Sequence, residues 1–463
     1  MSTDDILDHV DATLDARLDR LFELIRIPSV STDPAHASDC RAAADWLARD
    51  LASIGFDASV RDTDGHPMVV GHGPDAPGPH VLFYGHYDVQ PADPLALWQS
   101  DPFEPILRES PDGETHIVGR GASDDKGALM TFMEACRAWV EMRGTLPIRV
   151  SILFEGEEES GSRSLAPFLE ATAEELRCDT VLVCDTDMWD RDTPAVTTML
   201  RGLVGQEMTI TCADRDLHSG MFGSAARNAG QVLADVIASL RAPDGSVAID
   251  GFYDGVRDLD PAIAAMWAEL PFDAEAFLGD IGLTVPAGEA GRSVLEQVWA
   301  RPTCEVNGIW SGYTDPGFKT VIPAQAHAKL SFRLVAGQEP EAIRAAFQAH
   351  VRARLPEDCG VTFADHGLSP AWSMPTDGAF LKATLGALTE EWETRAAIAG
   401  TGGTIPIIGE FERRLGVGAL LVGFGRFDNR IHSPNEKYDL SSYHRGIRSW
   451  VRILDALSRC KKD

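Results

Sequence analysis

The apolar and polar positions of the first 200 residues form two alternating kinds of segment. Short apolar runs bounded by Gly, Pro or acidic residues are typical of buried strands and lie at 68–70, 81–84, 148–154 and 180–184. Apolar residues at helical spacing predict helices over about 4–25, 38–54, 127–142 and 163–176. Residues 92–117 contain the Pro, Asp and Ser residues typical of a loop. This alternation predicts an α/β fold, a mostly parallel sheet with helices on both faces.

The pattern changes near residue 200. Residues 208–212 alternate like a half-buried strand. The stretch that follows mixes expected helices at about 224–241, 259–269, 289–300 and 340–354 with expected strands at about 304–310, 326–335 and 360–365. The α/β pattern resumes from about 377, with helices to 393 and 414, a strand at 418–424 and a final helix from about 441. We therefore expect one discontinuous domain, residues 1–200 and 367–463, interrupted by an α+β insertion at 201–366.

Side chains capable of metal or acid–base chemistry follow three of the predicted strands. His86 and Asp88 come after the first, Glu157–Glu159 after the second and Asp185 after the third. Because the carboxyl ends of parallel strands meet at one edge of a sheet, these groups can converge. Each group taken alone is better explained as a solvated turn or a charged face.

Two further candidate groups lie outside these strand ends. Asp124 and Asp125 come just before the helix expected at 127, and His432 lies in a loop near the C-terminus. Two imidazoles and several carboxylates from separate loops form a nitrogen and oxygen ligand set that suits zinc, manganese or cobalt. Bound cations would also relieve the repulsion among the carboxylates. Together the groups predict a metal site.

Composition adds limits on size, partners and compartment. The 463 residues suggest about two to three units. A formal net charge of −30 argues against nucleic acid as a partner, and no apolar run approaches the length of a membrane span. The acidic N-terminus lacks the pattern of a signal peptide, and the eight cysteines are scattered without a CxxC pair. We expect reduced thiols and a cytoplasmic protein.

Several sequence strings resemble the motifs of one enzyme family. They are HVLFYGHYDVQP, GRGASDDKG, LFEGEEESGS, VLVCDT, DLHSGMFG, KTVIP, SFRLV and RIHSPNEKY, and they run from about residue 80 to 440. The chain resembles the dinuclear zinc exopeptidases, which include carnosinases, cytosolic non-specific dipeptidase, carboxypeptidase G, aminoacylase and succinyl-diaminopimelate desuccinylase. The EESGS and HSPNEK strings are most similar to the dipeptidase and carnosinase branch.

The resemblance implies two divalent ions per chain, expected to be zinc, with manganese or cobalt as alternatives. Its implied ligands are His86 and Asp185 for one ion, Glu159 and His432 for the other, and Asp124 as the bridge. Asp125 stands where most relatives in the branch carry Asn. Asp88 is better suited to accept a hydrogen bond from the His86 ring and fix its tautomer.

The same resemblance makes Glu158 the general base. It would take a proton from a metal-bridging water and pass it to the leaving nitrogen. The alternative is that Glu157, Glu158 and Glu159 are interchangeable in role, and the register of the GEEESGS string favours Glu158.

Arg333 and Thr320 match substrate-facing positions of the family, and two further candidates are Thr404, which stands where relatives carry Ser, and Gly403. An arginine fork suits a substrate carboxylate, and glycines allow backbone N–H groups to approach one. Without the motif, Arg333 would be read as part of a surface ion pair.

His218 in DLHSGMFG is the remaining candidate. Taken alone, a His before Ser-Gly is a structural turn residue. In the relatives, this histidine comes from the neighbouring subunit of a dimer formed through the inserted lid domain and stabilises the developing oxyanion. The resemblance therefore implies a homodimer, with the 201–366 insertion as lid and dimerisation domain.

The function expected from these residues is a metal-dependent hydrolase that cleaves the amide bond of dipeptides bearing a free carboxylate. An alternative is an N-acyl-amino-acid amidohydrolase that uses the same site. A catalytically dead binding protein is a third alternative, but the expected ligands and base are all present in the sequence.

Overall fold

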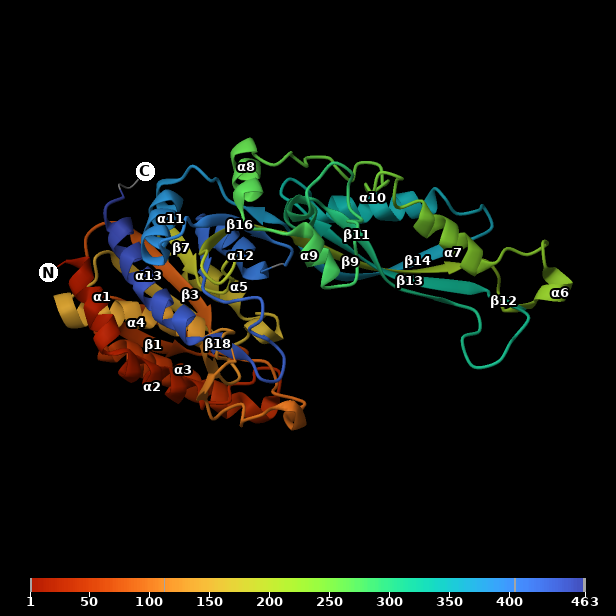
Figure 1. Cartoon of the computed structure of the whole chain (residues 1–463). Coiled ribbons are helices and arrows are strands. Elements are labelled where there is room, and N and C mark those ends of the chain that lie inside the picture. Colours follow the sequence, from red (N-terminus) through yellow and green to blue (C-terminus); the bar gives the residue numbers. More distant parts are fainter. Residues whose placement is uncertain (1, 112, 404, 461–463) are drawn as a thin grey trace. The chain divides into compact units, whose positions relative to one another are not determined.

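The computed structural model describes residues 2–111, 113–403 and 405–460. It divides into two compact units (Figure 1). Unit 1 comprises Met1–Thr198, Met374–Ala399 and Ile407–Asp463, and unit 2 comprises Met199–Ser373 and Gly400–Pro406. The insertion expected from sequence, 201–366, ends earlier than unit 2 and lacks the short returning stretch at 400–406.

Unit 1 is built on a mixed sheet whose strands run in the order β1-β2-β6-β3-β7-β17-β8. Their bounds are Asp57–Arg61, Met68–His72, Arg149–Glu155, His80–His86, Thr180–Val183, Ala419–Gly423 and Ala195–Leu200. The central strands β6, β3, β7 and β17 are parallel. β1 and β2 on one side, and β8 on the other, join antiparallel. The sheet is therefore parallel only at its centre, where three strands end in the predicted site residues.

Helices cover both faces of this sheet. The main ones are α3 (Ala37–Ser53), α4 (Lys126–Arg143), α5 (Leu165–Thr172), α11 (Ala379–Trp392), α12 (Pro406–Leu415) and α13 (Leu440–Ser458). Neighbouring residues of β3 point to opposite faces. Phe83 stacks on Phe132 of α4 with ring centroids 3.9 Å apart, whereas Tyr84 contacts Phe411 of α12 edge to face at 5.3 Å.

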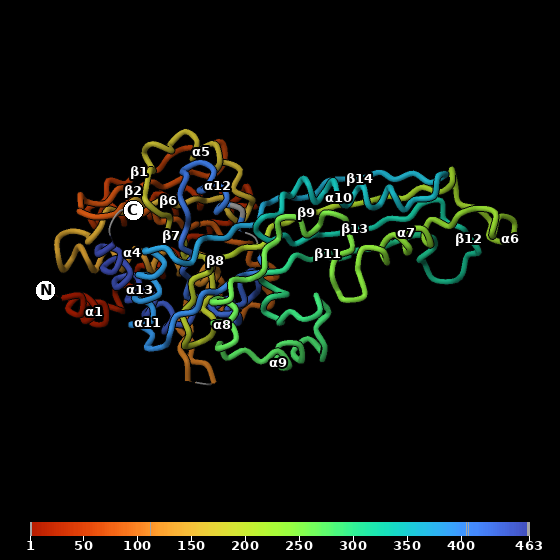
Figure 2. The backbone as a smooth tube through the Cα atoms, turned by 90° about the horizontal axis from the view of Figure 1, so that it is seen from above, coloured from red at the N-terminus to blue at the C-terminus, as the bar shows by residue number. Residues whose placement is uncertain are grey.

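The N-terminal segment closes unit 1 beside the C-terminal helix α13 (Figures 1 and 2). Thr3 donates to Asp455 at 3.0 Å. The single helix expected at 4–25 is two helices, α1 (Thr3–Ala12) and α2 (Leu14–Ile25). At the break, Thr13 leaves helical geometry with φ of −119° and ψ of 17°, and its hydroxyl donates to the His9 carbonyl, a side-chain bond that bends helices.

The expected loop at 92–117 contains a hairpin. Strands β4 (Ile106–Glu109) and β5 (Thr115–Val118) pair antiparallel, and β5 also pairs with β18 (Lys437–Asp439). The pairing partner lies more than 300 residues away in the sequence, which is why local patterning misses these strands.

Unit 2 is an antiparallel sheet with helices packed on one face. Its strand order is β11-β13-β9-β14, with bounds Thr303–Ser311, Gln325–Leu334, Gly202–Thr211 and Gly360–Ser369. Helices α7 (Ala229–Ala238) and α10 (Pro340–Arg352) share its apolar core, which includes Val204, Phe332 and Phe347. Other helices are α6 (Ser219–Phe222), α8 (Pro261–Glu269), α9 (Ala274–Gly279) and a π-helical turn at Glu296–Ala300. The helix expected at 289–300 is thus much shorter.

None of the helices within the described ranges is long and apolar enough to cross a membrane.

Candidate metal centre

His86 is the last residue of β3 and its side chain is buried. Its Nδ1 lies 3.1 Å from the backbone carbonyl oxygen of Asp88 and 3.4 Å from Asp88 Oδ1. Its Nε2 lies 3.1 Å from Asp124 Oδ1, without an aligned hydrogen bond to any described residue. The backbone N–H of His86 donates to Asp125 Oδ2 at 3.0 Å. The ring is therefore held from the Nδ1 side and presents Nε2 to the carboxylates.

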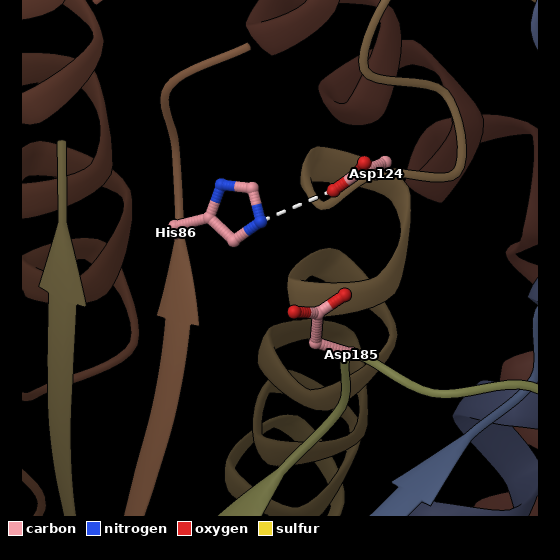
Figure 3. A group of neighbouring side chains, drawn as sticks. All are labelled: His86, Asp124 and Asp185. Atoms are coloured by element: carbon pink, nitrogen blue, oxygen red, sulfur yellow. Dashed lines mark ion pairs between the residues drawn. The ribbon is translucent and has the colours of Figure 1, made fainter. Parts of the chain in front are cut away.

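Asp124 and Asp185 complete a first group with His86 (Figure 3). Asp124 precedes α4, and Asp185 follows β7. One ligand atom from each of the three residues lies within 4.8 Å of those of the other two. Both carboxylates and the imidazole point toward a common space, as the chemistry of a shared cation requires.

A second group shares Asp124. It consists of Asp124, Glu159 and His432, again with ligand atoms within 4.8 Å of one another. His432 Nε2 lies 3.0 Å from Asp124 Oδ2 and 3.2 Å from Glu159 Oε2. His432 has a left-handed backbone with φ of 59°, a strained conformation for a residue with a side chain. Asp124 thus turns one oxygen toward each imidazole, which is the arrangement of a bridging ligand.

The electrostatics of the two groups reflect this crowding of charge. Burial would raise the pKa of Asp124, but the adjacent imidazoles of His432 and His86 hold it below its ordinary value. Burial and the charge of Asp124 raise the pKa of Asp185 to about 7. Contacts with Asp124 and Glu159 raise the pKa of His432 to about 10. Protons on the histidines therefore balance carboxylates here, and cations would compete with those protons.

The donor set fits two divalent ions. The buried Nε2 of His86 lacks an aligned hydrogen bond among the described residues, as expected of a ligand atom aimed at an ion. The two groups provide nitrogen and carboxylate oxygen, the ligands of zinc and similar metals.

Asp88 lies beside the His86 ring, as expected, and also binds the turn that follows β6. Its buried carboxylate accepts the backbone N–H groups of Glu158, at 3.2 Å to Oδ1, and of Glu159, at 3.1 Å to Oδ2. The backbone carbonyl of Asp88 is closer to the His86 ring than its carboxylate is. Asp88 therefore fixes the turn that presents Glu158 and Glu159 as well as the ring of His86.

Glu158 and Glu157 differ clearly in their surroundings. Burial raises the pKa of Glu158, whose carboxylate lies in the field of His86 and the other acidic groups. The Glu157 carboxylate instead accepts backbone N–H groups from His66 and Ser164 at 3.1 and 2.9 Å. Glu157 is therefore occupied in holding the chain, and this geometry favours Glu158 as the residue that handles protons.

His218 and Thr320 lie together in unit 2. The short strands β10 (Leu217–His218) and β12 (Val321–Ile322) pair, and Ser219 donates to the Thr320 carbonyl at 3.1 Å. His218 is exposed, and its Nδ1 accepts from the Gly220 N–H at 3.0 Å. A neutral His218 ring therefore carries its proton on Nε2, which makes Nε2 a hydrogen-bond donor.

Arg333 and Gly403 are both neighbours of Arg201, again within unit 2. Arg201 donates through its backbone to the Gly403 carbonyl at 3.2 Å and through Nε to the Gly402 carbonyl at 3.4 Å. Burial and the charge of Arg333 lower the pKa of Arg201 to about 10. Thr404, the fourth predicted substrate residue, lies outside the described residues.

Two residues near the metal groups had no role in the sequence analysis. Gln90 donates to Glu159 Oε2 at 2.8 Å. Glu436, inside the RIHSPNEKY string, is buried and binds the loop that carries Asp124. Glu436 could have been found from the sequence because it lies in the same RIHSPNEKY string as His432.

The chain matches the sequence model of peptidase family M20/M25/M40 over residues 82–456. It belongs to this family. The match includes the residues of both metal groups, and it makes the protein a peptide-bond hydrolase.

Individual relatives match over 81% to 99% of the chain. The Cys-Gly metallodipeptidase of Schizosaccharomyces pombe is 30% identical over 474 aligned positions, covering 99% of each chain. The beta-Ala-His dipeptidase of Homo sapiens is 28% identical and covers 81% of this chain and 74% of its own. The solved metallo-carboxypeptidase Sso-CP2 of Sulfolobus solfataricus superposes with a TM-score of 0.79 at 29% identity, covering 96% of this chain and 99% of that one.

Proposed function

We propose that this protein is a dinuclear metallodipeptidase that hydrolyses the peptide bond of dipeptides with a free carboxylate. The observation that carries the proposal is the pair of ligand groups that share Asp124. His86 and Asp185 would hold one ion, Glu159 and His432 the other. The similarity to two dipeptidases supports dipeptides as the substrate class.

Bound divalent ions, with zinc expected, would polarise the scissile carbonyl and make a water more acidic. Glu158 takes the proton of the attacking water and delivers it to the leaving nitrogen. Its raised pKa, caused by burial, suits a group that must both accept and release a proton. Asp88 holds Glu158 in place through the backbone N–H, and so limits the positions its carboxylate can adopt.

Residues of unit 2 supply recognition in this proposal. Arg333 binds the substrate carboxylate through its guanidinium fork, with Thr320, Gly403 and Thr404 as further contacts. The charge of the half-buried Arg201 acts on the same region as Arg333 and would add to the attraction of a substrate carboxylate.

We further propose a homodimer in which unit 2 is the dimerisation domain and His218 acts on the partner's substrate. Strand β11 is an edge of the unit 2 sheet and leaves Val306, Ile309 and Trp310 exposed by 42%, 54% and 40%. An exposed apolar edge strand is suited to pairing with a second copy. The Nε2–H of His218 is the donor that would meet the developing oxyanion.

The cytoplasm is the proposed compartment. The eight cysteines are scattered along the chain without a CxxC pair, which is the usage expected of reduced thiols.

A substrate panel with added Zn²⁺ or Mn²⁺ tests this function. It contains a free dipeptide, the same dipeptide with a C-terminal amide, an N-acyl-amino acid and a longer peptide. We expect fast cleavage of the free dipeptide and poor cleavage of its amide, because the amide lacks the charge that Arg333 binds. Preferential cleavage of the acyl-amino acid would contradict the dipeptidase assignment, and equal cleavage of the amide would contradict the carboxylate contact.

A further inference from the structure

Glu436 connects the two loops that bring the shared ligand and the second histidine together. It lies four residues after His432, immediately before β18, and its side chain is fully buried. A buried carboxylate is costly unless hydrogen bonds satisfy both oxygens. The contacts of Glu436 therefore indicate what it is for.

Both oxygens of Glu436 bind the segment 120–124. Oε1 accepts the backbone N–H groups of Ser123 at 2.9 Å and Asp124 at 3.1 Å. Oε2 accepts the backbone N–H of Gly121 at 3.0 Å and a guanidinium N–H of Arg120 at 2.7 Å. Four donors thus converge on one carboxylate, and three of them are backbone groups of the loop that ends in Asp124.

Further contacts join the same two segments. The Glu436 carbonyl accepts from the Gly119 N–H at 3.1 Å, and the side chain of Asn429 bonds the Ser123 hydroxyl at 2.8 Å. Between Asn429 and Glu436 stands His432, whose Nε2 lies 3.0 Å from Asp124 Oδ2. The distance between Asp124 and His432 therefore depends on how the two segments are clamped.

We infer that Glu436 is a positioning residue of the metal centre: its carboxylate fixes the backbone of Asp124 so that each oxygen of Asp124 faces one ion position. The inference rests on the proposed dinuclear function. Supporting hydrogen bonds of this kind typically alter metal affinity by about 10–100-fold when removed.

The competing explanation is that Glu436 only neutralises the buried Arg120. Arg120 has other contacts, with the Pro91 carbonyl at 3.1 Å and the ring of Trp98. The contacts of Oε1 with Ser123 and Asp124 do not involve Arg120 at all. A charge-balancing role predicts lower stability with unchanged metal affinity, whereas a positioning role predicts weaker metal binding.

The test compares Glu436→Gln with Glu134→Gln. An amide in place of Glu436 has a single acceptor oxygen and sets an NH₂ group against the donors of the loop. Glu134 is a matched control, because its carboxylate is equally buried and binds Arg17 and Arg20. Zn²⁺ and Mn²⁺ affinities of the full chain are measured by competition with a chromophoric chelator. We expect about 10–100-fold weaker binding in Glu436→Gln and wild-type affinity in Glu134→Gln.

Each other result decides against the inference. Wild-type affinity in Glu436→Gln, or an equal loss in both variants, would show that Glu436 is structural only. If Glu436→Gln does not fold, the double variant Glu436→Gln with Arg120→Met, which leaves no unpaired buried charge, is judged by the same criteria. A wild-type chain that binds fewer than two ions would overturn the proposed function itself, and the inference with it.

Discussion

Among the residues of the proposed site, Glu158 transfers the proton, whereas the residues around it hold the metal ions. Glu158→Ala should retain both metal ions and lose about 10²-fold or more in kcat, the usual loss when acid–base catalysis is removed. Metal content and steady-state kinetics of the same preparation check this. Glu157→Gln is the control, because Glu157 is engaged by two backbone N–H groups and should keep near-normal kcat. A near-normal rate in Glu158→Ala would place the base elsewhere, and loss of an ion would make Glu158 a ligand.

Glu155 predicts a pH dependence of stability. Burial raises its pKa to about 8, although Ser162 and Tyr84 donate to its Oε1. Because the folded chain holds this proton more tightly than the unfolded chain, the contribution of Glu155 to stability is fully present below the ordinary pKa of 4.5 and is lost as the pH rises toward 8.

Glu155→Gln keeps the shape and the acceptor oxygen but carries no charge. In metal-free protein, the difference in free energy of unfolding between Glu155→Gln and the wild type should shift in favour of the variant as the pH rises from about 4.5 to 8. The total shift should be at least about 1 kcal/mol. Denaturant titrations across this range measure the difference. A difference that does not change with pH would show that Glu155 ionises normally in the fold.

Much of the site could be predicted at this scale, because its residues lie in short strings at the ends of apolar strands. The structure brings His86, Asp124 and Asp185 into one group and Asp124, Glu159 and His432 into a second, with ligand atoms within 4.8 Å of one another in each group. Two positions were missed: Gln90, which donates to the Glu159 side chain, and Glu436, which binds mainly backbone groups. Glu436 binds N–H groups of a loop more than 300 residues away, and no side-chain pattern encodes such a contact.

At the scale of elements, helix α2 is attached to α4 by a buried charge cluster. The carboxylate of Glu134 accepts from Arg17 at 2.7 Å and from Arg20 at 2.6 and 2.7 Å. Glu134→Ala would leave the fully buried Arg17 with only a 3.5 Å ion pair to the partly exposed Glu141, at a cost of about 3–5 kcal/mol in the free energy of unfolding.

Arg20→Ala is the comparison for this cluster, since Arg20 is partly exposed and its removal leaves Glu134 paired with Arg17. Arg20→Ala should lower the free energy of unfolding by clearly less than Glu134→Ala does. Urea unfolding monitored by circular dichroism measures both. Equal losses would show that the cluster does not depend on the buried Arg17–Glu134 pair.

Elements were predictable where packing follows local periodicity, as in β3, β6, α4 and α13. Elements could not be predicted where hydrogen bonds to a distant part of the chain determine the structure. The β4–β5 hairpin is extended by β18, and β8 (Ala195–Leu200) joins β17 from a distant part of the chain. The antiparallel sides of the sheet are likewise invisible in the pattern, because strand direction depends on connections rather than on the residues of a strand.

At the scale of the whole molecule, the proposed dimer makes a distinctive prediction. His218→Ala and Glu158→Ala should each be nearly inactive, with a loss of about 10²–10³ for His218, the scale of a missing oxyanion donor. If His218 acts on the partner's substrate, a mixed dimer of the two variants contains one complete site. After subunit exchange of an equal mixture, roughly a quarter of wild-type activity should return, since half the dimers are mixed and each has one working site.

The control for this mixture is subunit exchange within a single variant, which cannot form a complete site. Two samples of the same variant, mixed identically, should stay inactive, and exchange is verified with a tag on one variant. No recovery after proven exchange would mean that His218 acts within its own chain or has no catalytic part.

Metal stoichiometry is the direct test of whether two ions share Asp124. Metal-free protein is titrated with Zn²⁺ while bound metal and dipeptide hydrolysis are measured together. The account predicts two ions per chain in the wild type, with activity absent from the metal-free protein. In Asp185→Ala the account predicts selective weakening of one site, and in Asp124→Ala weakening of both. Full activity without metal, or an Asp124→Ala variant that still binds two ions normally, would contradict it.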